Sequence, residues 1–283
     1  MRLGIDQESL TPPPHQTSRR ETAQSAVLAW SGCALLGLCV IQSLLHSLQS
    51  APLRRSFAIS LLISAIFASI VWRLRAATRG GVLAGALVCL VLLLPPAGRD
   101  PEVHYAGLLA LIALFAISFF ATRFGRSHKE ARGLAESRHG RQASQIVANL
   151  AAAALFAHAG HTVGCVAALA QAAADTSSSE IGQAVGGTVR MVTTWRRVPS
   201  GTDGGITLGG TCAGIFAAAI VTTVSSAGHL TWNQALIAFI AAIAGLLFDS
   251  LLGATVERRG WFYNDLVNFT STVFAAILAT ALT

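Results

Sequence analysis

The stretch YAGLLALIALFAISFFATRFGRSHKEARGLAESRHGR, residues 105–141, decides the fold. Its first half, up to residue 122, is predominantly apolar and close to the roughly 20 residues that a helix needs to cross a bilayer. Its second half carries six basic residues. Because Lys and Arg accumulate in cytoplasmic loops, this half predicts a loop on the cytoplasmic side. A membrane span followed by a cytoplasmic loop sets the pattern for the rest of the chain.

The composition of the whole chain favours a membrane protein over a soluble one. Hydrophobic residues make up 53% of its 283 residues and charged residues 12%, whereas a soluble domain has about 25% charged residues. The mean hydropathy is +0.59. Basic cytoplasmic loops account for the net charge of +7, so we expect no nucleic-acid partner. The five cysteines lie in apolar segments without metal-ligand spacing and predict buried apolar side chains.

Nine apolar segments predict an all-α, polytopic bundle of about nine membrane spans. They cover residues 26–46, 56–73, 80–97, 105–122, 142–158, 162–176, 206–226, 232–255 and 264–282. The fifth and sixth are alanine-rich and carry polar residues, so we expect them inside the bundle, shielded from lipid. Alternation from the basic loop places the N-terminus in the cytoplasm and the C-terminus outside.

The chain divides into three parts at the sequence level. Residues 1–22 are polar, contain three consecutive prolines and lack the apolar core of a signal peptide, so we expect a flexible cytoplasmic tail. Residues 23–122 hold four generic spans. Residues 123–283 hold five spans, cytoplasmic loops and nearly all the unusual polar residues, and are the predicted catalytic membrane region. Without a targeting peptide, an integral protein of the bacterial inner membrane is expected.

Four aspartates beyond residue 140 lie at or near the cytoplasmic ends of predicted spans: Asp175, Asp203, Asp249 and Asp265. A carboxylate at membrane depth costs about 2.5–3.5 kcal/mol on insertion scales and is normally retained for ion binding, proton transfer or substrate contact. A helix-capping role at the interface is the alternative for any single aspartate. Four together favour a functional site.

Helical spacing extends these aspartates into polar stripes, because residues four apart share one face of a helix. The stripes are Arg141, Gln145 and Asn149; Gln171, Asp175 and Ser179, with Glu180 beside them; Asp249, Gly253 and Glu257; and Asn264, Asn268 and Thr272, with Asp265 alongside. We expect the stripes to converge on one cytoplasm-facing cavity. Its carboxylate and amide oxygens suit Mg2+, which is usually held by one or two carboxylates together with substrate phosphates.

The connection RMVTTWRRVPSGTDGGITLGGTCAG, residues 190–214, is rich in glycine. Glycines allow a backbone to approach an anion closely, and the helix that follows offers free N–H groups to phosphate oxygens. Arg196 and Arg197 stand just upstream. The loop is not a Walker A motif, because the GK[ST] ending is absent. A glycine-rich turn with small residues for helix packing is the alternative interpretation.

Five segments resemble an integral-membrane family that contains the plant phytyl-phosphate kinase of the vitamin E pathway and the vertebrate transmembrane protein 19. They are residues 121–150, ADTSSSEIG (174–182), RRVPSGTDGGITLGGTCAG (196–214), FDSLLGATVE (248–257) and NDLVNFTST (264–272). The resemblance implies phosphorylation of an isoprenyl monophosphate to the diphosphate by a nucleoside triphosphate. Related lipid kinases and CDP-diacylglycerol synthases favour CTP and Mg2+.

The motif residues of this family match named positions in the chain. Its aspartates match Asp175, Asp203, Asp249 and Asp265, which we predict to be catalytic, and its basic loop matches the stretch with Lys129, Arg138 and Arg141. Mg2+ is expected at Asp175, Glu180, Asp249 and Asp265. Nucleotide and phosphate binding is predicted for Lys129, Arg141, Asn149, Ser179, Arg196, Arg197, Gly201, Thr202, Gly204, Gly205, Asn264 and Asn268. Expected partners are an isoprenyl phosphate, a nucleoside triphosphate such as CTP, and membrane lipids; formation of a homo-oligomer stays open.

Three alternatives compete with a kinase. A CTP-dependent cytidylyltransferase acting on a lipid phosphate would use the same ions and glycine loop, but would release pyrophosphate and a CDP-lipid. A transporter or flippase of phosphorylated lipids or cations predicts polar residues continuing to the external side. A purely structural membrane protein does not explain four costly aspartates.

Overall fold

Serine and threonine caps begin five helices of the computed structural model, which describes residues 18–94, 105–134 and 140–283. At α1 (Arg19–Ser47), the Ser18 hydroxyl accepts a hydrogen bond from the Glu21 N–H while the Glu21 carboxylate accepts one from the Ser18 N–H. This capping box satisfies two backbone donors at the helix start. Similar caps begin α2 (Ala51–Arg73), α3 (Arg79–Leu93), α8 (Leu208–Ser226) and α9 (Trp232–Leu252).

Each of the nine predicted segments corresponds to a long helix, and the predicted α-helical bundle is confirmed. The remaining four are α4 (Tyr105–Arg123), α6 (Ala143–His158), α7 (Thr162–Val185) and α10 (Asn264–Ala281). Several boundaries differ from the prediction. Helix α2 begins at Ala51, five residues before the predicted start, and α3 ends at Leu93, while residues 95–97 of the predicted third segment lie outside the described residues. Helix α1 begins at Arg19, inside the predicted tail, whose residues 1–17 lie outside the described residues. Helix α7 continues past residue 176 to Val185. The prediction stopped too early because the last turns of this helix are polar and carry no hydropathy signal.

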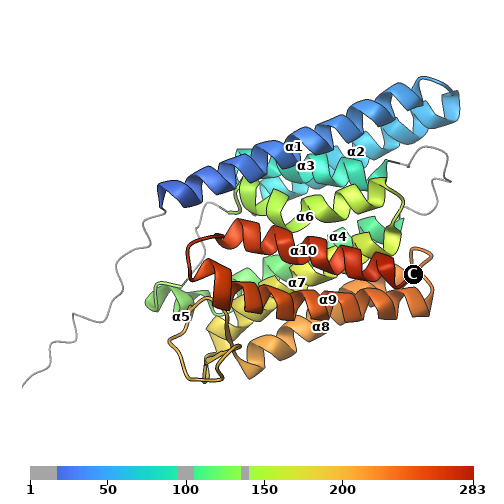
Figure 1. Ribbon diagram of the computed structural model, residues 1–283. Coiled ribbons are helices and arrows are strands. Elements are labelled where there is room, and N and C mark those ends of the chain that lie inside the picture. Colours follow the sequence, from blue (N-terminus) through green and yellow to red (C-terminus); the bar gives the residue numbers. More distant parts are fainter. Residues whose placement is uncertain (1–17, 95–104, 135–139) are drawn as a thin grey trace, which may run out of the picture.

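Smaller elements at one end of the bundle were not predicted. A short helix, α5 (Arg126–Ala131), forms in the basic loop. Strands β1 (Arg190–Met191) and β2 (Gly205–Ile206) pair antiparallel, so the fold contains a strand pair that the all-α prediction lacked. Helix α9 continues into a π-helical turn, η3 (Gly253–Glu257). Figure 1 shows α5, the loop between α7 and α8, and η3 at the same end of the bundle.

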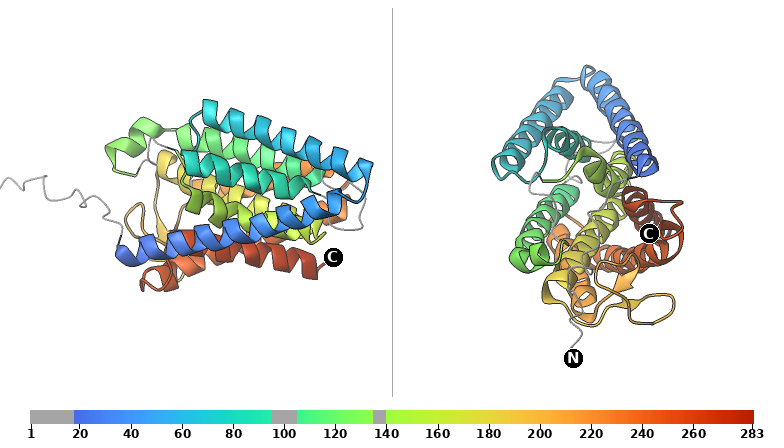
Figure 2. Two further views of the ribbon diagram at one scale, coloured as in Figure 1. Left: turned by 90° about the horizontal axis from the view of Figure 1, so that it is seen from above. Right: turned by 90° about the vertical axis from the view of Figure 1, so that its left-hand side faces the viewer.

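Helix α7 is the central element of the bundle, as the view along the helices in Figure 2 shows. Most of its residues from Val163 to Ala174 are buried alanines, valines and other small side chains. Small residues let helix backbones approach closely in membranes. At Gly210 of α8, for example, a Cβ would lie 2.4 Å from the Ser178 carbonyl oxygen of α7. Residues Val147 to Ala154 of α6 are buried as well, so the predicted shielding of the fifth and sixth segments is confirmed for α6 and α7.

Large apolar side chains on the outer helices suit a lipid environment. Trp30 and Leu38 on α1 and Leu62 on α2 are 60–78% exposed. By length and composition, five helices within the described residues are long and apolar enough to cross a membrane: α1, α2, α4, α8 and α9 with η3. Helices α3 and α6 are apolar but shorter. The protein is thus a membrane-embedded helical bundle.

Candidate active site

Two aspartates on neighbouring helices lie close together at the loop end of the bundle. Asp175 of α7 and Asp249 of α9 interact electrostatically, and both line one cavity of about 210 Å³. Helices α7 and α9 approach each other at Gly245, where a Cβ would lie 2.7 Å from Cγ of Gln171. The missing side chain at Gly245 therefore lets the two carboxylate-bearing helices meet.

Helix α10 fixes the position of one of these carboxylates. The Ser271 hydroxyl is fully buried and donates a hydrogen bond to Oδ2 of Asp249 at 2.5 Å. A hydroxyl donor to an ionised acceptor makes a short, strong hydrogen bond. The orientation of Asp249, which lines the cavity, is thus set by a neighbouring helix.

The glycine-rich loop closes the cavity from the outside. The Val192 N–H donates to the Gly204 carbonyl at 3.1 Å, and the Gly205 N–H donates to the Thr202 carbonyl at 2.9 Å, so the loop is a defined turn. Gly204 has a φ of +73°, and a Cβ there would lie 2.4 Å from the backbone nitrogen of Ala254 in η3. Only glycine fits this left-handed, close-packed position. The contact holds Thr202 and Asp203 over the cavity.

Four carboxylates line this cavity: Asp175, Asp203, Asp249 and Glu257. Glu257 interacts electrostatically with Asp203 and with Asp175. Glu257 was not predicted as a site residue, although it lies eight residues from Asp249 on the same polar stripe. The turn of η3 brings it to the cavity together with the glycine loop.

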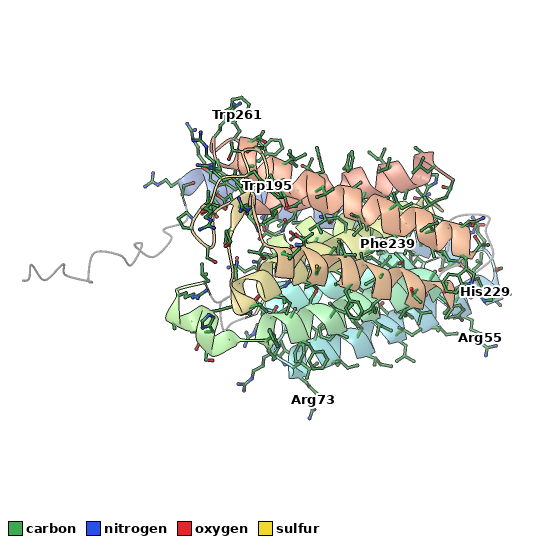
Figure 3. The ribbon with its side chains drawn as sticks, turned by 90° about the horizontal axis from the view of Figure 1, so that it is seen from below. Arg55, Arg73, Trp195, His229, Phe239 and Trp261 are labelled. Atoms are coloured by element: carbon green, nitrogen blue, oxygen red, sulfur yellow. The ribbon has the colours of Figure 1, made fainter. Side chains whose placement is uncertain are left out.

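The structure brings nine of the predicted site residues to this cavity: Asp175, Ser179, Gly201, Thr202, Asp203, Gly204, Gly205, Asp249 and Asn264. They come from α7, the glycine loop, α9 and the start of α10. Three of the four polar stripes therefore converge here, and the loop joins them. Figure 3 shows Trp195 of this loop and Trp261 at one end of the molecule, with His229 and Arg55 at the opposite end.

Arg141 borders the site from the other side of α7. Its guanidinium donates to Oγ1 of Thr176 at 3.3 Å and interacts electrostatically with Asp175. Two backbone hydrogen bonds fix it against the start of α3: the Arg141 N–H donates to the Ala76 carbonyl, and the Thr78 N–H donates to the Arg141 carbonyl, both at 3.0 Å. Arg141 is thus a positioned cation beside the first aspartate.

Two predicted site residues are paired with each other. Lys129 of α5 is completely buried and donates to the Glu180 carboxylate of α7 and to the Thr122 carbonyl at 3.0 Å. Neither side chain lines the Asp175 cavity. Their contact joins the basic loop to the central helix. Arg138, matched to the same basic loop, lies outside the described residues.

The other predicted site residues lie apart from the Asp175 cavity. Asp265 is buried in the first turn of α10 and lines a second cavity with Glu21 and Gln145. Asn149 lines a third cavity, between α2, α3, α4 and α6. The remaining three line none of these cavities: Asn268 is buried on α10, and Arg196 and Arg197 are exposed on the loop.

The donor set of the Asp175 cavity fits a hard cation held in part by its substrate. No group of three or more His, Cys, Asp or Glu side chains within the described residues is arranged to hold a metal by itself. Asp175 and Asp249, however, offer two neighbouring carboxylates. Mg2+ typically takes one or two carboxylates and completes its shell with water and phosphate oxygens. A divalent cation would also offset the repulsion between the clustered carboxylates.

Comparison with known proteins agrees with this architecture. The family model described as Integral membrane protein DUF92 matches residues 62–276. "Protein VTE6, chloroplastic" of Arabidopsis thaliana is 32% identical over 191 residues, which cover 62% of this chain and 57% of that protein. An uncharacterized membrane protein of Methanocaldococcus jannaschii is 29% identical over 232 residues, covering 78% of this chain and 91% of that protein. No solved structure matches.

The fold and the site define an α-helical integral membrane protein with a carboxylate-lined cavity closed by a glycine loop. The chain belongs to the integral membrane family DUF92, whose model covers more than half of its length. The predicted resemblance to the family of the plant phytyl-phosphate kinase is confirmed. The chain spans less than two thirds of the length of the plant relative.

Proposed function

We propose that this protein is an isoprenyl-monophosphate kinase, which transfers a phosphoryl group from a nucleoside triphosphate, with CTP as the favoured donor, to a phytyl, geranylgeranyl or farnesyl phosphate. The observation that carries the proposal is the meeting of Asp175, Asp249 and the glycine loop in one cavity, beside Arg141. The similarity to the plant relative supports the same class of substrate.

The chemistry of this transfer suits the residues of the site. An oxygen of the lipid phosphate attacks the terminal phosphorus of the triphosphate, the bond from that phosphorus to the bridging oxygen breaks, and a nucleoside diphosphate leaves. The attacking oxygen is already anionic, so no general base is needed. The barrier lies in bringing two polyanions together and stabilising the transferred group, which positioning and positive charge accomplish.

Each part of the cavity has a role in this proposal. Asp175 and Asp249 would hold Mg2+, which when bound offsets the charge of the triphosphate. Residues 201–205 line the cavity and would offer phosphate oxygens backbone N–H groups other than those of Thr202 and Gly205, which donate within the loop. Arg141 sits next to Asp175 and would hold the acceptor phosphate, since a guanidinium binds phosphate oxygens in a bidentate manner.

The topology that goes with this function has nine spans, the N-terminus in the cytoplasm and the C-terminus outside. The basic residues of α5 and of the α7–α8 loop lie at the same end as the site, which supports a cytoplasmic active site with access to nucleotides. For a bacterial chain the inner membrane is the corresponding location.

Product analysis tests the proposal. The purified full chain in lipid nanodiscs is incubated with Mg2+, geranylgeranyl or phytyl phosphate, and CTP, UTP or ATP in turn. The expected result is isoprenyl diphosphate and a nucleoside diphosphate, both lost in Asp175→Asn at the Mg2+ concentration that saturates the wild type. Formation of a CDP-lipid with pyrophosphate would establish the cytidylyltransferase instead. No product with any donor or chain length would refute both enzymes.

A further inference from the structure

An apolar slot lies between α2, α3, α4 and α6, on the side of α6 away from the Asp175 cavity. Its walls are apolar side chains and small residues of α2, α3 and α4, among them Phe67, Val71, Gly85, Leu111 and Phe115. Its cavity volume, on the same measure as the 210 Å³ of the Asp175 cavity, is about 70 Å³, and part of it opens to the outside. The rings of Phe67 and Phe115 meet edge to face, with centroids 5.5 Å apart, and join α2 to α4.

One end of the apolar slot is polar. Arg141, two residues before α6, and Gln145 and Asn149 of α6 also line the slot. The side-chain amide of Asn149 donates to the Gln145 carbonyl at 2.9 Å, which fixes its orientation. The slot thus has an apolar body and a cationic head at Arg141, the shape expected for a site that binds an amphiphile.

Arginines line a cavity next to this slot. This cavity shares Ala76 and Arg141 with the slot and is also lined by Arg75, Arg123 and Arg126. Its one acidic lining residue, Glu130, pairs with Arg126 at 3.0 Å. The guanidinium of Arg123 lies 3.4 Å from the centre of the Phe119 ring and donates to the Leu74 carbonyl, so it stands where the apolar wall ends. We call these four arginines the arginine rim.

We propose that the apolar slot binds the isoprenyl chain of a phosphorylated isoprenoid and that the arginine rim binds its phosphate. The inference rests on the proposed function and deepens it by assigning the substrate chain to particular helices. Arg141 belongs to the slot, to the rim and to the contact with Thr176, the neighbour of Asp175. The lipid phosphate thus reaches the transferred group from one side of Arg141, while the triphosphate occupies the carboxylate cavity on the other.

The chemistry of the slot favours an isoprenyl chain with a compact anionic head. The walls offer aromatic and branched apolar surface, which binds a branched chain by burial and dispersion. The rim carries an excess of positive charge, which suits a phosphate monoester. The arrangement also gives the helices α2, α3 and α4 a function, since they supply the walls of the slot.

Photolabelling tests the location directly and does not depend on turnover. Geranylgeranyl phosphate with a diazirine at the far end of its chain is bound to the full chain in nanodiscs and irradiated, and the labelled peptides are identified by mass spectrometry. Labels on α2, α3 or α4 at the slot residues are expected, and excess geranylgeranyl phosphate should suppress them. Labels confined to residues that do not line the slot would overturn the inference. Equal suppression by phosphatidic acid would also overturn it, because it would show a general site for anionic lipids.

A cavity-filling variant tests the chain fit. A Cβ at Gly85 meets nothing within 4 Å, so Gly85→Leu places its side chain in the slot without a backbone clash. Gly37 of α1 is the matched control, because a Cβ there also meets nothing within 4 Å and Gly37 lines none of the cavities described above. We expect the ratio of kcat/KM for the C20 over the C10 substrate to fall at least about tenfold in Gly85→Leu, since one methylene in an apolar pocket changes discrimination roughly 10–200-fold. Gly37→Leu keeps the wild-type ratio.

The outcomes separate this inference from the proposed function. If the wild type makes diphosphate but Gly85→Leu keeps the wild-type chain preference and the label lies elsewhere, the slot assignment is wrong and the kinase stands. If the label lies in the slot but the wild type transfers no phosphoryl group, the isoprenyl phosphate site stands and the kinase is wrong.

Discussion

Lys129 and Glu180 form a buried ion pair that joins the basic loop to the central helix, 51 residues away along the chain. Lys129 is completely buried, and its ammonium also donates to the carbonyls of Ala121 and Thr122 at 3.3 and 3.0 Å. All three of its donors are thus used inside the protein. The single lysine of the chain thus holds α5 against α7.

Removing one partner of this pair should destabilise the protein. Lys129→Met leaves the Glu180 carboxylate buried without its cation, and breaking a buried pair in this way costs about 3–5 kcal/mol. We expect a clearly lower midpoint of thermal unfolding in nanodiscs, followed by intrinsic fluorescence. The double variant Lys129→Met/Glu180→Gln should recover much of the loss, because no charge is left buried. A single variant as stable as the wild type would contradict a structural role for the pair.

The carboxylates should differ in their effect on the metal requirement. Asp175→Asn and Asp249→Asn remove the two neighbouring carboxylates of the cavity. Because changes to residues behind the ligands already cost roughly 10–100-fold in metal affinity, we expect at least that increase in the Mg2+ concentration for half-maximal activity. Asp265→Asn is the comparison, since Asp265 lines a separate cavity with Glu21 and Gln145. An equal effect of all three variants would place Asp265 in the metal site and contradict the separation.

The sequence predicted the helices well, but it predicted the contacts between distant residues less well, for physical reasons. Four-residue spacing correctly brought Asp175 and Ser179 to one cavity with Asp249. Hydropathy located each long helix because burial in lipid demands apolar length, but it missed the polar end of α7 and the turn η3. No local pattern reveals a contact such as Lys129 with Glu180, which depends on how α5 folds back onto α7.

Adjacent residues show the same limit. Asn264 and Asp265 follow one another at the start of α10, but neighbouring residues on a helix point about 100° apart. The two side chains therefore differ in what they line. Asn264 lines both the Asp175 cavity and the second cavity, whereas Asp265 lines only the second. Glu257 illustrates the opposite error: its stripe was recognised, but its place beside Asp203 depends on η3, which the sequence did not predict.

The glycine loop should depend on one glycine more than on its neighbours. Gly204→Ala puts a Cβ 2.4 Å from the Ala254 nitrogen at a φ of +73°, so the loop must move away from η3. Backbone strain of this kind costs of order 1–3 kcal/mol, and we expect KM for the nucleotide to rise about 5- to 100-fold. Gly209→Ala is the control, because its Cβ would lie 3.8 Å from Val185 in ordinary contact. Equal KM values for the two variants would show that the loop does not bind the nucleotide.

The hydrogen bond behind Asp249 offers the most selective test of the metal site. Ser271→Ala removes the hydroxyl that lies 2.5 Å from Oδ2 of Asp249 but leaves every carboxylate in place. Because residues that orient a metal ligand are worth roughly 10–100-fold in metal affinity, we expect a rise of that size in the Mg2+ concentration for half-maximal activity, with little change at saturating Mg2+.

A neighbouring hydroxyl supplies the control for this test. Thr270→Ala, one residue earlier on α10, removes a hydroxyl that donates to the Leu266 carbonyl of its own helix at 2.7 Å. The Ser271 hydroxyl also lies 2.9 Å from the Val267 carbonyl, so a loss of helix hydrogen bonding alone would affect both variants equally. A shift in Mg2+ dependence confined to Ser271→Ala would therefore arise from Asp249. The same maximal rate and Mg2+ dependence in both variants would mean that Asp249 does not act through a bound metal.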